Sequence, residues 1–185
     1  MTTKAVAHWS DALVKLSACA VAIDFAKTQP DLATAWKLCD RGDWMLWLAE
    51  RFAGPAGSDA RRPLVLAACG CARLALARFE ERNPTESRPR KAIETAESWA
   101  RNSGATLAKV HSAAYAVAAA AAVVGAAVDA AFAAAAAAAY AVDAYAVDAA
   151  YAAAYAARST ARTDTLKRCA DIVRAFYPNP PELSK

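Results

Sequence analysis

The chain has 185 residues, of which 57% are hydrophobic and 22% are charged, and its formal net charge is +4 at pH 7. This composition excludes a disordered chain, and the length predicts a single domain over residues 1–185 with a core of its own. The small net charge gives no reason to expect a polyanionic partner. Basic residues exceed acidic ones in 1–110 and 158–185, whereas 111–157 holds three aspartates and no Lys or Arg.

Hydrophobic spacing predicts two helices before residue 40. Ser10 is suited to cap the first helix, which runs to Thr28 and carries Leu13 and Ile23 on its inner face. Asp31 is suited to begin the second helix, because its side chain can accept hydrogen bonds from the first backbone N–H groups.

After a break at residues 41–43, the run 44–48 is apolar on every side. A helix of that kind is normally buried. A Gly- and Pro-containing loop follows at 54–58, and Pro63 suits the first turn of a helix that runs to about Arg82.

A linker at 83–87 leads into a helix that carries opposite charges four residues apart. Pro89 suits its first turn, and Gly104 is expected to cap its C-terminus. Such charge pairs stabilise an exposed helix face by about 0.2–0.5 kcal/mol each. The pairs are Arg90 with Glu94 and Glu97 with Arg101.

Residues 113–157 are mostly alanine, which has the highest intrinsic helix propensity. One straight helix from 106 to 157 would be about 75 Å long, longer than a globule of this size is wide. We therefore expect the tract to turn at least once, near Gly125 or Asp129, and to form a central helical hairpin. Alanine is barely apolar and Asp129 is unfavourable in a bilayer, so no membrane span is expected.

A final amphipathic helix is predicted to begin near Thr163 and to end before the prolines at 178, 180 and 181. No segment shows the alternation typical of a strand. The predicted fold is all-α, a compact multi-helix bundle of about seven to nine helices around the alanine-rich hairpin. Mixed-charge helices occupy 1–110, alanine-rich core helices 111–157, and the C-terminal helix with a Pro-rich end 158–185.

The motifs of common enzyme and cofactor sites are missing from the sequence. Cys69 and Cys71 stand two apart, and on a helix they would point about 200° apart, so we do not expect them to share a metal. Asp143 and Asp148 would lie on opposite sides of the Tyr140 face of a helix, and they are expected to be solvated or bonded to tyrosine. We predict no enzyme, no metal and no cofactor, with a helical active site built on these residues as the alternative.

Cysteine usage and the N-terminus both indicate a cytoplasmic protein. The cysteines are odd in number and lack metal spacing, which predicts reduced, largely buried thiols. They are Cys19, Cys39, Cys69, Cys71 and Cys169. The first residues do not resemble a secretory signal, because Asp11, Lys15 and Asp24 interrupt the apolar region.

The best interaction candidates are charged and aromatic residues at two predicted helix starts. Trp and Arg are frequent in binding hot spots, and basic residues at a helix start oppose the helix dipole. The candidates are Arg41, Asp43, Trp44, Arg88, Arg90, Glu94 and Glu97. Either they bind a partner or they form an internal salt-bridge network that closes one end of the bundle. A nucleic-acid-associated accessory protein, using the arginine clusters at helix starts, is the alternative function.

Four segments, at 41–48, 62–75, 88–99 and 169–174, resemble a family of bacterial putative immunity proteins of polymorphic toxin systems. The resemblance implies an all-α cytoplasmic protein that binds and blocks a cognate toxin by contact, without catalysis. Immunity proteins against nucleases are often acidic, whereas this chain is weakly basic, which argues against a nuclease as the target.

Overall fold

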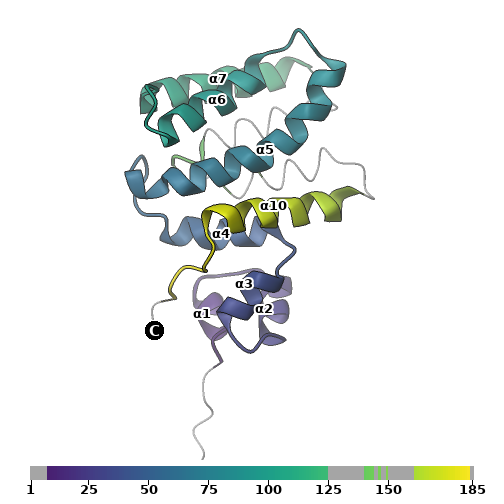
Figure 1. Ribbon diagram of the computed structural model, residues 1–185, viewed down its shortest axis with the longest axis vertical. Coiled ribbons are helices and arrows are strands. Elements are labelled where there is room, and N and C mark those ends of the chain that lie inside the picture. The colour runs from purple at the N-terminus through teal and green to yellow at the C-terminus, as the bar shows by residue number, and fades with distance from the viewer. Residues whose placement is uncertain (1–7, 125–139, 144–145, 147–148, 150–160, 184–185) are drawn as a thin grey trace, which may run out of the picture. The chain divides into compact units, whose positions relative to one another are not determined.

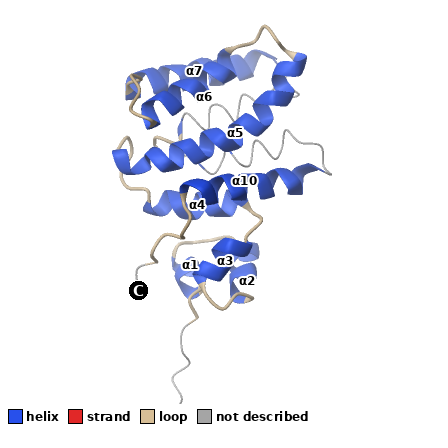
Figure 2. Ribbon diagram, in the orientation of Figure 1, coloured by secondary structure: helices blue, strands red, loops and turns tan. Residues whose placement is uncertain are grey.

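The computed structural model describes residues 8–124, 140–143, 146, 149 and 161–183. Within these residues the chain forms helices joined by turns and loops and contains no strand, which confirms the all-α prediction (Figure 2). The chain groups into two compact units, Met1–Cys39 with Asn179–Lys185 and Asp40–Pro178. Each unit is described by itself. None of the described helices combines the length and the apolar character needed to cross a membrane.

The smaller unit contains α1 (Asp11–Lys15), α2 (Ala20–Lys27) and α3 (Leu32–Leu38). The prediction of one continuous helix from Ser10 to Thr28 is wrong, because the chain turns at Ser17, whose φ of 62° is left-handed. The N–H groups of Ser17 and Ala18 donate to the carbonyl oxygens of Val14 (2.9 Å) and Leu13 (3.0 Å), the two hydrogen bonds of a Schellman motif.

The two N-terminal caps predicted from the sequence, at Ser10 and Asp31, have opposite outcomes. Ser10 does not cap α1, because its hydroxyl oxygen lies 2.8 Å from His8 Nδ1 instead. Asp31 caps α3 as predicted, because its carboxylate accepts a hydrogen bond from the Thr34 N–H at 2.6 Å. This hydrogen bond lowers the pKa of Asp31 below its ordinary value.

The larger unit is built on α5 (Arg62–Arg82), which lies between two helix pairs (Figure 1). On one side lie α4 (Gly42–Phe52) and α10 (Arg162–Phe176), both in contact with α5. On the other side lies α6 (Arg88–Ala100), which is in turn covered by α7 (Leu107–Val124). A short 3₁₀ helix, η1 (Asp59–Arg61), precedes α5.

Small residues allow α5 and α4 to approach α10 closely. An added Cβ at Gly42 would lie 2.4 Å from Cys169 Cβ and 2.6 Å from Ala170 N, and one at Gly70 would lie 2.8 Å from a methyl of Ile172. The thiols of Cys69 and Cys71 diverge as predicted. Cys69 Sγ is directed to the Ile93 carbonyl on α6 and Cys71 Sγ to the Cys169 carbonyl on α10.

Pro63 and Pro89 lie in the first turns of α5 and α6, as predicted. The predicted cap at Gly104 is wrong. Asn102, with φ 57°, takes the left-handed position, while Ser103 N–H donates to the Ser98 carbonyl at 2.8 Å. Asn is the residue that most readily replaces Gly at this position, because its short polar side chain tolerates the left-handed conformation.

The alanine-rich tract is described only in part. α7 is described as far as Val124, so the predicted turn near Gly125 or Asp129 and the expected hairpin lie outside the described residues. Residues 140–143 form a turn whose Val142 carbonyl accepts a hydrogen bond from Gly57 N–H at 2.8 Å. The loop before α5 is thereby joined to the tract.

Candidate functional site

Three of the seven candidate residues form one cluster at the start of α4. The Arg41 guanidinium donates two hydrogen bonds to the Asp43 carboxylate, at 2.9 and 2.6 Å, and lies 4.2 Å from the centre of the Trp44 ring. The Asp43 side chain is only 3% exposed, whereas Arg41 and Trp44 are half-buried. Asp43 therefore orients Arg41 over the indole, and the exposed parts of the cluster are Arg41 and Trp44.

The other four candidates lie on α6, and Glu97 is the most buried of them. Its carboxylate accepts hydrogen bonds from Arg73 of α5 at 2.7 and 2.9 Å and from Arg101 at 3.0 Å. Burial raises the pKa of Glu97, but the hydrogen bonds from the two arginines outweigh burial and hold the pKa below its ordinary value. Glu97 is thus an ionised group that joins α6 to α5.

The first turns of α6 carry ion pairs that are more exposed. Arg88 donates to the Glu86 carboxylate, which lowers the pKa of Glu86 to about 2. Arg90 donates to Glu80 of α5 at 2.6 Å and lies 3.6 Å from Glu94. The predicted ion pair of Arg90 with Glu94 is therefore present, and Arg90 also forms an ion pair with Glu80 of α5.

The seven candidates do not form a single site. The α4 cluster and the α6 residues lie on opposite sides of α5 (Figure 1). Sequence reasoning identified the pairs Arg90–Glu94 and Glu97–Arg101. It missed the partners on α5, Arg73 and Glu80, because nothing in sequence spacing shows which faces of two helices meet. It also missed Glu86, two residues before Arg88.

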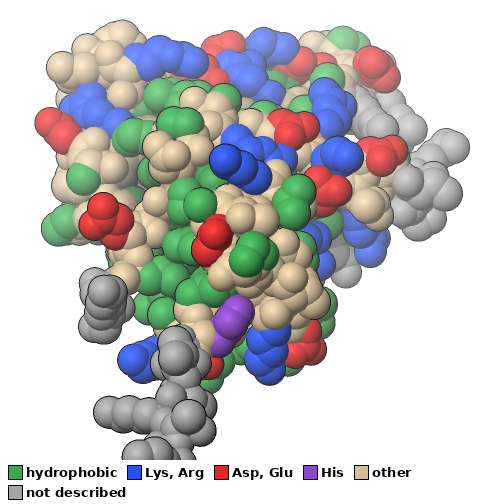
Figure 3. Space-filling model, turned by 60° about the horizontal axis from the view of Figure 1, so that its bottom comes forward, with side chains coloured by type: hydrophobic (Ala, Val, Ile, Leu, Met, Phe, Trp, Pro, Cys, Tyr) green, Lys and Arg blue, Asp and Glu red, His purple; other side chains and the backbone are tan. Residues whose placement is uncertain are grey.

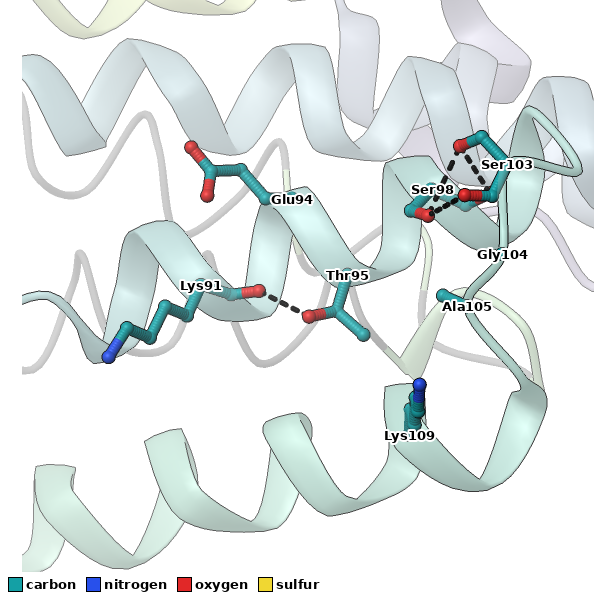
Figure 4. Close-up of a pocket in the computed structure, with 8 residues that line it drawn as sticks. All are labelled: Lys91, Glu94, Thr95, Ser98, Ser103, Gly104, Ala105 and Lys109. Carbon is teal, nitrogen blue, oxygen red and sulfur yellow. Dashed lines mark hydrogen bonds between the residues drawn. The ribbon is translucent and has the colours of Figure 1, made fainter.

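Sequence reasoning also missed a groove between α6 and α7. It consists of two adjoining cavities of about 470 and 370 Å³ that share Lys91, Thr95 and Lys109. Figure 4 shows Lys91 and Thr95 on α6, Lys109 on α7, and Glu94 with its carboxylate on the side of α6 away from α7. The spacing of 88, 91, 92, 95 and 98 along one helical face is a signal that could have indicated this surface.

Arg61 and Arg62, two arginines at a helix start that the nucleic-acid alternative would use, make structural hydrogen bonds. Arg61 is 4% exposed and donates from Nε and Nη2 to the Ala141 carbonyl, both at 3.1 Å, and from Nη1 to the Gly54 carbonyl. Arg62 donates to Asp59 and to the Trp99 carbonyl. In the view of Figure 3, cationic and anionic side chains of the described residues are interspersed, without one continuous cationic surface.

The tyrosine and aspartate residues of the alternative active site make ordinary structural contacts where they are described. His111 Nε2 lies 3.0 Å from Asp143 Oδ2, at ion-pair distance but without the angle of a hydrogen bond. Tyr140 packs edge-on against Tyr115. Asp148 lies outside the described residues. Among the residues that are described, no group of three His, Cys, Asp or Glu side chains could hold a metal ion.

A family model described as "Imm-5 like putative immunity protein" matches residues 55–176. The chain belongs to this Imm-5 like family. Comparison with the curated proteins and with the solved structures gives no match. The family match supports an immunity-type role in general terms.

The segment that matches the Imm-5 like family runs from the loop before α5 to the end of α10. It includes the α6 ion pairs and every residue that lines the groove. The α4 cluster of Arg41, Asp43 and Trp44 lies before the matched segment. The groove between α6 and α7 therefore lies within the part of the chain that the family shares, and the α4 cluster does not.

Proposed function

We propose that this chain is a non-catalytic immunity protein that binds a cognate toxin protein in the bacterial cytoplasm and blocks it by contact. The observation that carries the proposal is the family match over residues 55–176. Contact inhibition needs a folded surface that presents side chains, and α6 presents exposed charged side chains while ion pairs join it to α5.

Within this proposal the seven candidate residues divide by exposure. Arg88, Arg90 and Glu94 are exposed on α6 and are the proposed contact residues there, and Arg41 with Trp44 is the proposed contact pair on α4. Asp43 and Glu97 are buried and hydrogen-bonded to arginines. Their proposed role is to hold those arginines in place, because a buried carboxylate offers a partner little surface.

The proposal predicts that a gene adjacent to that of this chain encodes a growth-inhibiting protein, and co-expression of that protein with this chain tests it. We expect growth to be restored and the two proteins to purify as a complex. Toxin activity measured against increasing amounts of this chain should fall to zero at a fixed molar ratio, because a contact inhibitor acts stoichiometrically. Loss of toxicity at a small fraction of that ratio would indicate catalysis, and unchanged toxicity beside a folded chain would refute the proposal.

The nucleic-acid alternative is separated from this proposal by salt dependence. A protein that binds through phosphates loses affinity steeply as salt rises, because it releases counterions. We expect binding of this chain to duplex DNA or RNA to be weak at physiological salt, with no sequence preference. Tight nucleic-acid binding with a steep salt slope would favour the accessory-protein alternative.

A further inference from the structure

We propose that the groove between α6 and α7 holds an acidic segment of the partner protein, whose Asp and Glu carboxylates pair with Lys91 and Lys109. This inference rests on the proposed function for the identity of the partner. It goes beyond that function by assigning the contact surface and the chemistry of the segment that binds there.

The shape of the groove suits a polypeptide segment. The two cavities share three lining residues, so they form one continuous depression along both helices. Its walls contain small side chains that let another chain approach the helix backbones: Ala92, Ala105, Ala113 and Ala116. None of the described residues that line it is aromatic, so they offer no platform for stacking nucleic-acid bases.

Lys91 and Lys109 supply the positive charge of the groove that no ion pair of the described residues neutralises. Arg88 also lines it but is paired with Glu86, and Glu94 is the one acidic residue among the described lining residues. The Glu94 carboxylate lies on the side of α6 away from α7 and is near Arg90 (Figure 4). Among the described residues, no carboxylate oxygen comes within 4.0 Å of either lysine nitrogen. Both lysines are exposed and can therefore meet carboxylates of a partner.

Stability does not explain the positions of these lysines. Lys91 and Lys109 lie in the first turns of α6 and α7, where a positive charge opposes the helix dipole, and neither first turn holds an acidic residue. The nearby hydroxyl groups do not replace the lysines as anion ligands. Thr95 donates to the Lys91 carbonyl at 2.6 Å, and Ser98 and Ser103 bond to each other.

The test is an NMR titration of the isotope-labelled full chain with a short synthetic peptide of Glu, Asp and Ala. We expect shift changes in the backbone amides of residues 88–98 and 103–116. The double variant Lys91→Glu with Lys109→Glu should weaken binding about tenfold or more, since it places like charges opposite the peptide. This variant should stay folded, because the new carboxylates are exposed and lie in helix first turns, where negative charge is favourable.

The matched control is Lys15→Glu with Lys37→Glu, which changes the net charge equally at two exposed lysines elsewhere. It should change the affinity by no more than about twofold, as expected for distant exposed charges. Equal weakening by both double variants, shift changes confined to other residues, or tighter binding of single-stranded DNA of the same net charge would each overturn the proposal.

The toxin co-expression assay separates this inference from the proposed function. If the wild-type chain protects and Lys91→Glu with Lys109→Glu protects equally well, the groove assignment is wrong and the immunity role stands. If the wild-type chain fails to protect but the acidic peptide still binds between α6 and α7, the immunity role fails and the groove stands as a site for acidic peptides.

Discussion

The backbone of Gly42, at the start of α4, lies so close to Cys169 of α10 that no β-carbon fits between them. An ideal Cβ at Gly42 would be 2.4 Å from Cys169 Cβ and 2.6 Å from the Ala170 backbone nitrogen. Two of the atoms in the way, Ala170 N and Cys169 C, are backbone atoms and cannot move aside without shifting α10. This contact sets the distance between the two helices.

We therefore expect Gly42→Ala to lower the free energy of unfolding by about 3 kcal/mol or more, beyond the ordinary cost of overpacking. Urea denaturation followed by circular dichroism measures this loss. The matched control is Gly70→Ala, whose new Cβ would meet a side-chain methyl of half-buried Ile172. Alanine also gains about 1 kcal/mol of helix propensity at that position, so Gly70→Ala should stay within about 1–2 kcal/mol of the wild type. Similar losses for both variants would contradict this account.

Glu97 should make stability depend on pH. Its pKa is lower in the folded chain than in the unfolded one, so its contribution is present above the unfolded pKa and is lost as pH falls through the folded pKa. Glu97→Gln should lower the free energy of unfolding at pH 7 by about 1–3 kcal/mol, because Arg73 and Arg101 lose their shared carboxylate.

The difference between Glu97→Gln and the wild type should shrink as the pH falls below the unfolded-state pKa of Glu97, because the unfolded chain then binds a proton that the folded chain does not. Denaturation curves at several pH values measure it. Glu94→Gln is the control, because Glu94 is half exposed and 3.6 Å from Arg90. Its effect should be at most about 0.5 kcal/mol at pH 7. A Glu97→Gln difference that does not change with pH would show that the pKa of Glu97 is the same in the folded and unfolded chains.

Arg61 should be needed to join the loop before α5 to the turn at 140–143. Arg61→Ala leaves the buried Ala141 carbonyl without its two N–H donors and should cost about 2–4 kcal/mol. Arg61→Lys keeps the charge but not the planar guanidinium, so its free energy of unfolding should lie between those of the wild type and Arg61→Ala. Thermal unfolding compares the three.

Arg51→Ala serves as the control for Arg61, because Arg51 is exposed and its guanidinium lies 5.0 Å from the Trp47 ring centre. Arg51→Ala should lower the free energy of unfolding by about 0.5–1 kcal/mol, the value of an exposed cation–π contact. A loss from Arg61→Ala no larger than this would mean that the hydrogen bonds to Ala141 contribute little to stability.

The thiols should differ sharply in reactivity. Burial raises the pKa of Cys69, and in Cys71 a hydrogen-bonding contact with Cys169 and burial together raise the pKa, so neither forms a thiolate near neutral pH. Cys19 is exposed, and Cys39 and Cys169 are buried. A chromogenic disulfide reagent should react quickly with one thiol of the native chain and with five after denaturation. Cys19→Ser should abolish the fast phase. Rapid reaction in that variant would show that a buried thiol is accessible.

The sequence predicts helix starts, a helix cap and short-range ion pairs well, because these depend only on residues that are close in the chain. Pro63 and Pro89 open helices, Asp31 caps α3, and the charge pairs within α6 form, because each depends only on residues within one helical turn. The errors also have local causes. Ser17 and Asn102 take left-handed conformations that glycine usually adopts. Because neither is glycine, nothing in the sequence indicates a helix end at Ser17. The predicted cap of α6, at Gly104, lies two residues after its true position at Asn102.

By itself, the sequence determined the helical class, the approximate helix bounds and the resemblance to immunity proteins, because helix propensity, hydrophobic spacing and motifs are properties of neighbouring residues. Only the tertiary structure decided that Glu97 pairs with Arg73, that Arg61 reaches Ala141, and that Lys91 and Lys109 face one groove. These relationships join residues on different elements. They depend on which helix faces pack together, and that is set by the summed packing of the whole core rather than by any short segment.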